Sequence, residues 1–99
     1  MKPLKYHPAA DAEIDDAYDW YAHRSADAAD RFYEEFYPAI QRIRQQPGLH
    51  AEYIYGTRRV VLSYYPYFVV YRELPRKIEI IAVAHAKRRP GYWKKRTKH

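Results

Sequence analysis

Cysteine is absent from this 99-residue sequence, and only three glycines are present. Without cysteine the chain has no disulfide framework, no cysteine-based zinc site and no thiol nucleophile. Three dispersed glycines also leave no glycine-rich loop that could hold a phosphate. No apolar run approaches the roughly 20 residues of a membrane span, and the first lysines are not followed by the apolar stretch of a signal peptide. We therefore expect a cytoplasmic protein with no membrane partner, no metal and no cofactor.

Acidic residues are scarce in the second half of the chain. Residues 51–99 contain twelve Lys or Arg against three Asp or Glu, a net charge of +9. Residues 1–50 contain six Lys or Arg against nine Asp or Glu, a net charge of −3. Such asymmetry favours an acidic partner for the second half, either a nucleic acid or an acidic protein segment. We interpret residues 86–99, which contain no acidic group, as a basic C-terminal tail.

The first half of the chain has the periodicity of helices. Residues 4–7 alternate between apolar and polar and predict a short strand. Pro8 suits the first position of a helix, and Ser25 or Asp27 can cap a second helix. We expect this second helix to end near residue 46, because a Pro-Gly pair follows. Its apolar face, the predicted core, consists of Ala29, Phe32, Phe36, Ile40 and Ile43.

The period changes to two in the second half, which is typical of strands. Alternation begins at Arg58, and residues 67–74 and 78–85 form two more strand-like runs, separated by a turn. Three strands with tight connections form an antiparallel meander, so the predicted order is β-α-α-β-β-β. We therefore predict an α+β fold with a helical hairpin packed on one face of a twisted antiparallel sheet. We expect residues 1–99 to form a single domain.

Candidates for catalysis are few. The serines and threonines lie in no nucleophile motif, and the five histidines are dispersed with no pair at metal-ligand spacing. One group of basic and aromatic residues remains, and it suits a phosphate-rich ligand because guanidinium groups bind phosphate oxygens and rings stack on bases. A solvated tail with its aromatic residues packed on the sheet edge explains the same residues equally well. The predicted target-contacting set is Arg58, Arg59, His85, Lys87, Arg88, Arg89, Tyr92 and Trp93.

Two segments carry a family resemblance. The strand YFVVYRE at residues 67–73 and the finish AVAHAKRRPGYW at residues 82–93 resemble those of the RelE/ParE superfamily. The order of the elements and the chain length agree, so the resemblance covers nearly the whole chain. These proteins are the toxic halves of bacterial type II toxin–antitoxin modules. The resemblance therefore implies a RelE/ParE-like toxin domain whose tail contacts the target.

The superfamily implies two different activities. RelE-like toxins cut mRNA in the ribosomal A site, whereas characterised ParE-like toxins lack this nuclease activity and poison DNA gyrase. RelE-like nucleases typically carry an Arg where this chain has Phe68, and a phenyl ring cannot stabilise a scissile phosphate. The resemblance is therefore closer to ParE-like members, with gyrase as the expected target and no catalytic residue assigned.

Two alternatives to gyrase inhibition stay open. The first is a RelE-like, metal-independent mRNA endonuclease that acts at the ribosome with His85, Arg88 and Tyr92 as its catalytic residues. The second is a non-toxic nucleic-acid-binding module of the same fold, in which the basic half simply holds a polyanion.

The resemblance also implies a cognate antitoxin as partner. Antitoxins of these modules have a disordered C-terminal segment that folds onto the toxin, and the basic half of this chain favours an acidic one. Exposed apolar positions on the helical hairpin and the sheet could receive that segment. The expected antitoxin-binding residues are Tyr18, Tyr21, Tyr33 and Tyr71.

Overall fold

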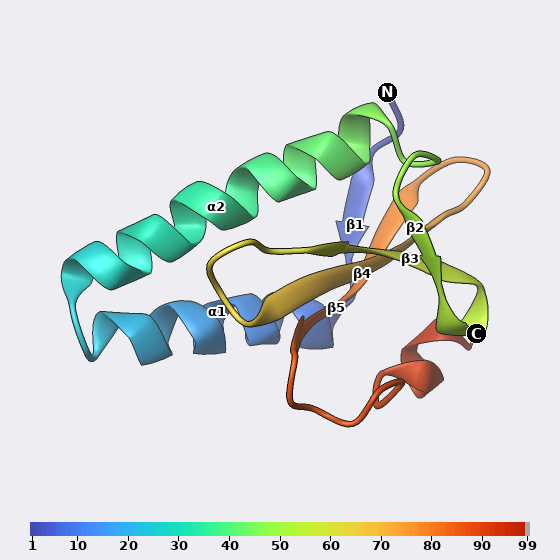
Figure 1. The fold of residues 1–99 in the computed structure, drawn as a ribbon. Coiled ribbons are helices and arrows are strands. Elements are labelled where there is room, and N and C mark those ends of the chain that lie inside the picture. Colours follow the sequence, from blue (N-terminus) through green and yellow to red (C-terminus); the bar gives the residue numbers. More distant parts are fainter. Residues whose placement is uncertain (99) are drawn as a thin grey trace.

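The computed structural model describes residues 1–98, so His99, the last residue of the predicted tail, lies outside the described residues. Among these residues, one strand and two α-helices are followed by four strands, and Figure 1 shows how they are arranged. The α+β class and the helical hairpin packed on a sheet are confirmed. The helices are α1 (Pro8–Ala22) and α2 (Ala26–Gln45), and the strands are β1 (Leu4–Tyr6), β2 (Ala51–Tyr53), β3 (Thr57–Val61), β4 (Tyr67–Glu73) and β5 (Ile78–His85).

The sheet differs from the prediction in two respects. Its order is β1-β5-β4-β3-β2, and β1 runs parallel to β5, with Leu4 opposite Ile78. The sheet is therefore mixed rather than wholly antiparallel, because β1 is parallel to β5 while the other neighbouring strands are antiparallel. The other difference is β2, a three-residue edge strand that pairs with β3. It was missed because three residues are too few to establish an alternating pattern.

Both helices begin at the capping signals of the sequence. Pro8 occupies the first turn of α1, and the Nδ1 atom of His7 accepts a hydrogen bond of 3.1 Å from the backbone N–H of Ala9. Ser25 caps α2, since its hydroxyl oxygen accepts a bond of 3.3 Å from the backbone N–H of Ala28. Each cap satisfies an N–H group that the helix itself leaves without a partner.

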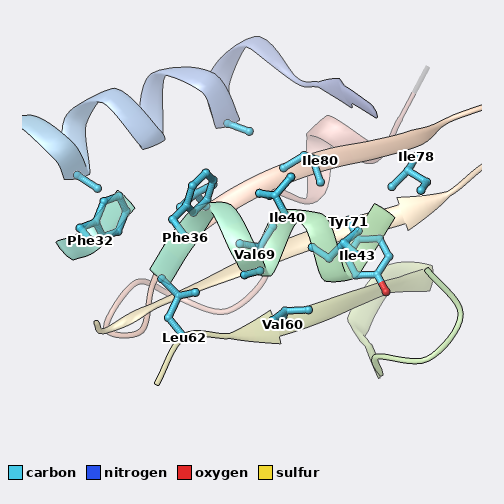
Figure 2. Close-up of a cluster of buried hydrophobic side chains, with 14 residues drawn as sticks. Phe32, Phe36, Ile40, Ile43, Val60, Leu62, Val69, Tyr71, Ile78 and Ile80 are labelled. Atoms are coloured by element: carbon cyan, nitrogen blue, oxygen red, sulfur yellow. The ribbon is translucent and has the colours of Figure 1, made fainter. Parts of the chain in front are cut away.

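The main core lies between the helices and the sheet. Figure 2 shows Phe32, Phe36 and Ile40 of α2 directed at strand residues such as Val69 and Ile80. All five apolar residues predicted for the face of α2 are buried. Burying a large apolar side chain contributes about 1.5–3 kcal/mol, so this face holds the hairpin on the sheet.

A second, smaller core lies on the opposite face of the sheet. It contains Phe68 and Val70 of β4, whose side chains alternate with those of the main core. A β-bulge in β5 opposite Val70 and Tyr71 places Ile81 and Ala82 together on this second face. The C-terminal segment, red in Figure 1, covers this face on the side away from α2. The second face is therefore buried by the C-terminal segment, which includes the short 3-10 helix η2 (Lys94–Thr97).

Candidate functional site

The C-terminal segment is folded onto the sheet and is not an extended, solvated tail. Gly91 has a φ of +76° and turns the chain toward the sheet. Trp93 is only 1% exposed, and its ring centre lies 6.0 Å from that of Tyr53 and 5.8 Å from that of Tyr55. The expectation that Trp93 contacts a target is therefore corrected. A buried indole offers no surface to a partner, and Trp93 instead anchors the segment.

Glu13 of α1 ties the C-terminal segment to the body of the protein. Its carboxylate accepts hydrogen bonds from the hydroxyl of Tyr92 at 2.6 Å and from the guanidinium of Arg96 at 2.8 and 3.1 Å. It also accepts a bond of 3.0 Å from the backbone N–H of Val83, in the part of β5 beyond its pairing with β1. Sequence reasoning missed this role because nothing in the helical spacing distinguishes Glu13 from the solvated acidic residues of α1.

Residues 85–89, which we name the basic turn, leave the end of β5 in a fixed conformation. The Nδ1 atom of His85 accepts a hydrogen bond of 3.0 Å from the backbone N–H of Lys87. The backbone carbonyl of His85 accepts one of 3.0 Å from the backbone N–H of Arg88. The guanidinium carbon of Arg88 lies 3.9 Å from the ring centre of Tyr92, a cation–π contact. Lys87, Arg88 and Arg89 are all exposed, so this part of the predicted target-contacting set lies together on the surface.

The side chains of Arg58 and Arg59 do not lie together on one surface. As neighbours on β3 they point to opposite faces of the sheet. Arg58 donates a bond of 2.6 Å to the carbonyl of His50 and lies 3.6 Å from the carboxylate of Glu52. Arg59 lies on the tail side, with its guanidinium carbon 4.2 Å from the ring centre of Tyr53. The structure therefore separates Arg58 from the tail and places only Arg59 on the same face.

The surroundings of Tyr92 bear on the nuclease alternative. Burial, followed by the hydrogen bond to Glu13 and the charge of that carboxylate, raises the pKa of Tyr92 well above its usual value. Its hydroxyl therefore stays protonated and donates to Glu13. The Nδ1 atom of His85 is occupied by the Lys87 N–H, so a neutral His85 ring carries its proton on Nε2. Neither residue presents a free basic atom to a 2′-hydroxyl in this arrangement.

A groove lined with tyrosines runs along the helical hairpin. It consists of two adjoining hollows of about 490 and 530 Å³ that share Tyr18 and Tyr33. Sequence reasoning did not include Tyr6 and Tyr37, which also line it. The described residues of the lining include no Lys or Arg, and four are acidic: Asp11, Asp15, Asp30 and Glu34. We name this feature the tyrosine groove.

The other two tyrosines predicted to bind an antitoxin lie elsewhere. Tyr71 is fully buried, and its hydroxyl donates a bond of 2.5 Å to the carbonyl of Pro47. It is therefore a core residue, and its predicted place on a binding surface is corrected. Tyr21 is partly buried, with its ring stacked 5.5 Å from that of Phe32 and edge-on to that of Tyr65. Tyr18 and Tyr33, at 38% and 46% exposed, stay available.

The part of the chain that the structure describes contains neither a cluster of metal ligands nor a membrane-spanning helix. Among residues 1–98, no three His, Cys, Asp or Glu side chains gather in the way that metal ligands do. Within the same range, neither helix has the length and apolar character needed to span a membrane.

Comparison with known proteins identifies the family of this chain. The model of the ParE toxin of type II toxin–antitoxin systems, parDE, matches residues 4–90. The chain belongs to the ParE toxin family. Toxin ParE2 of Mycobacterium tuberculosis, found in two strains, is 32% identical over 89 residues, which are 89% of this chain and 85% of that toxin. The match to the ParE family ends just before Gly91, so it includes the basic turn and leaves out Trp93.

A solved structure shares the ParE fold. It is described as the chromosomal ParDE TA system from P. aeruginosa and aligns with a TM-score of 0.69 at 18% identity. The alignment covers 88% of this chain and 98% of that chain. At this level of identity the likeness establishes a common fold and nothing finer.

Proposed function

We propose that this ParE-family toxin arrests growth by inhibiting DNA gyrase in the bacterial cytoplasm, and that its basic turn contacts the target. The observation that carries the proposal is the basic turn itself. Its cations are exposed, and its backbone is held by hydrogen bonds to His85. Because the turn is already ordered, binding through it loses little conformational entropy. Membership of the ParE family supports gyrase as the target.

The arrangement around the tail favours gyrase inhibition over mRNA cleavage. Phe68, in the place where a RelE-like nuclease carries Arg, lies in the second core and is 9% exposed. Tyr92 is a hydrogen-bond donor to Glu13, and His85 uses Nδ1 within its own turn. A metal-free ribonuclease needs a general base as well as a positive charge at the phosphate. Arg88 could supply the charge, but Tyr92 and His85 in this arrangement supply no free base.

The test compares gyrase supercoiling with the integrity of ribosome-bound mRNA. We expect the purified chain to inhibit supercoiling, to accumulate cleaved DNA complexes and to leave translated mRNA intact. Combined Arg88→Ala and Arg89→Ala changes should weaken inhibition by about tenfold or more, since each hydrogen bond to a charged group is worth about 1.5–3 kcal/mol.

A matched control removes the same charge from the other end of the sheet. Arg76→Ala with Lys77→Ala changes the turn between β4 and β5 and should leave inhibition unchanged. Codon-periodic cuts in mRNA would replace the proposal by the nuclease alternative. Equal inhibition by both double variants would remove the basic turn from the mechanism.

We also propose that a cognate antitoxin neutralises the toxin by inserting a segment into the tyrosine groove. Tyr18 and Tyr33 line both hollows and are partly exposed. Tyrosine is enriched among residues that dominate binding energy at interfaces. The acidic lining indicates that the bound segment combines apolar side chains with Lys or Arg. An acidic part of the antitoxin outside the groove would then pair with the basic second half of the toxin chain.

A further inference from the structure

The most exposed aromatic ring of the described chain lies outside the surfaces discussed above. Tyr64 is 90% exposed and lies in the loop between β3 and β4, which we name the aromatic tip (residues 63–66). A tyrosine ring left in water gains nothing from burial in the folded monomer. Its position therefore calls for an explanation other than packing.

The aromatic tip is held rigidly in spite of its exposure. The carboxylate of Glu35 on α2 accepts hydrogen bonds from the backbone N–H groups of Ser63 and Tyr64, the latter at 3.1 Å. The ring of Tyr65 packs edge-on at 5.4 Å from that of Phe32, and its hydroxyl donates a bond of 3.3 Å to the carbonyl of Ala28. The ring of Tyr64 is thus presented on a fixed backbone.

The aromatic tip adjoins the basic turn. The backbone N–H of Ala86 donates a bond of 2.7 Å to the carbonyl of Pro66, and Tyr67 pairs with His85 across the two strands. Arg31 of α2 shares a hollow of about 420 Å³ with Glu35 and Tyr64. Arg31 therefore lies beside the exposed ring and the cations of the basic turn belong to the adjoining loop, while the carboxylate of Glu35 is engaged by two N–H donors.

We propose that the aromatic tip and the basic turn form one binding surface for single-stranded nucleic acid. Tyr64 stacks on an unpaired base, and Lys87, Arg89 and Arg31 neutralise the phosphates on either side. An exposed aromatic ring combined with nearby cations is the arrangement by which proteins hold single strands without reading their sequence. A protein partner fits this surface less well, because stable protein interfaces bury about 800 Å² per partner around an apolar centre. The inference does not depend on gyrase being the target.

Fluorescence anisotropy of the full chain with labelled oligonucleotides tests this surface directly. The probes are thymidine and uridine homopolymers of about 15 nucleotides and a DNA duplex of equal length. We expect the single strands to bind more tightly than the duplex, whose base faces are covered. The thymidine and uridine strands distinguish DNA from RNA as the preferred ligand.

Three variants separate stacking from charge. Tyr64→Ala should weaken single-strand binding about tenfold, the effect of one lost base stack, without changing the salt dependence. Lys87→Ala with Arg89→Ala should reduce the slope of log affinity against log salt by about 1.4, at roughly 0.7 per phosphate contact. Glu35→Gln removes a negative charge and also one of the two acceptors that fix the tip. Weaker binding of this variant supports the role of Glu35 in positioning the tip.

The control is Tyr37→Ala, which removes a half-exposed tyrosine of α2 outside the aromatic tip and should leave affinity unchanged. Every variant changes an exposed or partly exposed side chain, and circular dichroism verifies the fold. Unchanged affinity of Tyr64→Ala, or a duplex that binds as tightly as the single strands, would overturn the proposal. Tighter binding of Glu35→Gln would show that charge alone decides the affinity and would equally count against a fixed tip.

Discussion

At the scale of the residue, the buried hydroxyl of Tyr71 makes the free energy of unfolding depend on pH in alkaline solution. Burial raises its pKa to about 12, above the value of about 10 for an exposed tyrosine. The unfolded chain therefore loses this proton at lower pH than the folded protein does. The contribution of Tyr71 is fully present below pH 10 and is lost as the pH rises from 10 to 12. Tyr92, whose pKa is also raised, acts in the same direction.

Tyr71→Phe should make the stability less sensitive to alkali. At pH 8 we expect the variant to be less stable by about 1 kcal/mol, because the hydrogen bond to the carbonyl of Pro47 is lost. Between pH 10 and 11.5 its free energy of unfolding should fall less steeply than that of the parent protein. Urea unfolding at several pH values measures both effects. Tyr64→Phe removes an exposed hydroxyl and should change neither, whereas parallel curves for Tyr71→Phe and the parent would contradict the prediction.

The sequence predicts which residues are apolar more reliably than which of them are accessible. Helical spacing correctly assigned Phe32, Phe36 and Ile40 to the core. The same spacing could not separate Tyr21, which packs on Phe32, from Tyr33, which lies in a groove. Tyrosine suits both environments, because its ring can be buried while its hydroxyl finds a partner. Only the path of the neighbouring strands decides between them.

At the scale of the element, the turn at Gly91 decides whether the C-terminal segment can fold back. Its φ of +76° is unfavourable for other residues, and a Cβ added there would lie 2.7 Å from Cε2 of Tyr55. Gly91→Ala should therefore lower the free energy of unfolding by about 2 kcal/mol, which includes about 1–2 kcal/mol for the left-handed backbone. Thermal unfolding measures the loss.

Gly48 provides the matched control for this substitution. A Cβ at Gly48 has no neighbour within 4 Å, and its φ is not positive. Gly48→Ala should be neutral or should stabilise the protein by up to about 1 kcal/mol, because it restricts the unfolded chain. A Gly91→Ala variant as stable as Gly48→Ala would mean that the segment does not need this turn.

The helices and strands that have local sequence signals could be predicted, but the elements against which they pair or pack could not. Caps and periodicity located both helices, and alternation located β3, β4 and β5. The parallel pairing of β1 with β5 has no local signal, because Leu4 and Ile78 are separated by nearly the whole chain. The folding-back of residues 94–97 depends on Glu13 of α1, which is equally distant. Contacts of this kind appear only when the layers are assembled.

At the scale of the whole molecule, charge is divided between two regions. The tyrosine groove is acidic, while the basic turn and the rest of the C-terminal segment carry no acidic residue. An antitoxin that neutralises the toxin through the groove should depend on Tyr18 and Tyr33. Changing both to Ala should weaken binding of the antitoxin segment by about 1,000-fold, at about 2 kcal/mol for each central interface tyrosine.

Isothermal titration calorimetry with the antitoxin C-terminal peptide measures this loss. Tyr64→Ala serves as the control, because it removes a more exposed tyrosine that lies outside the groove. Asp30→Lys should also weaken binding if the bound segment is basic where it meets the groove. Full affinity of the Tyr18→Ala and Tyr33→Ala double variant would place the antitoxin on another face.

The pairing of β1 with β5 also determines when the sheet can be completed during translation. Leu4 leaves the ribosome's catalytic site well before its strand partner Ile78, since the two helices and three further strands lie between them in the chain. Until β4 and β5 are complete, the helical hairpin has no sheet on which to bury Phe32 and Ile40. Pairings so distant in sequence form late and slowly. A ribosome that translates this chain therefore carries a helical hairpin without its complete sheet until β5 has been synthesised.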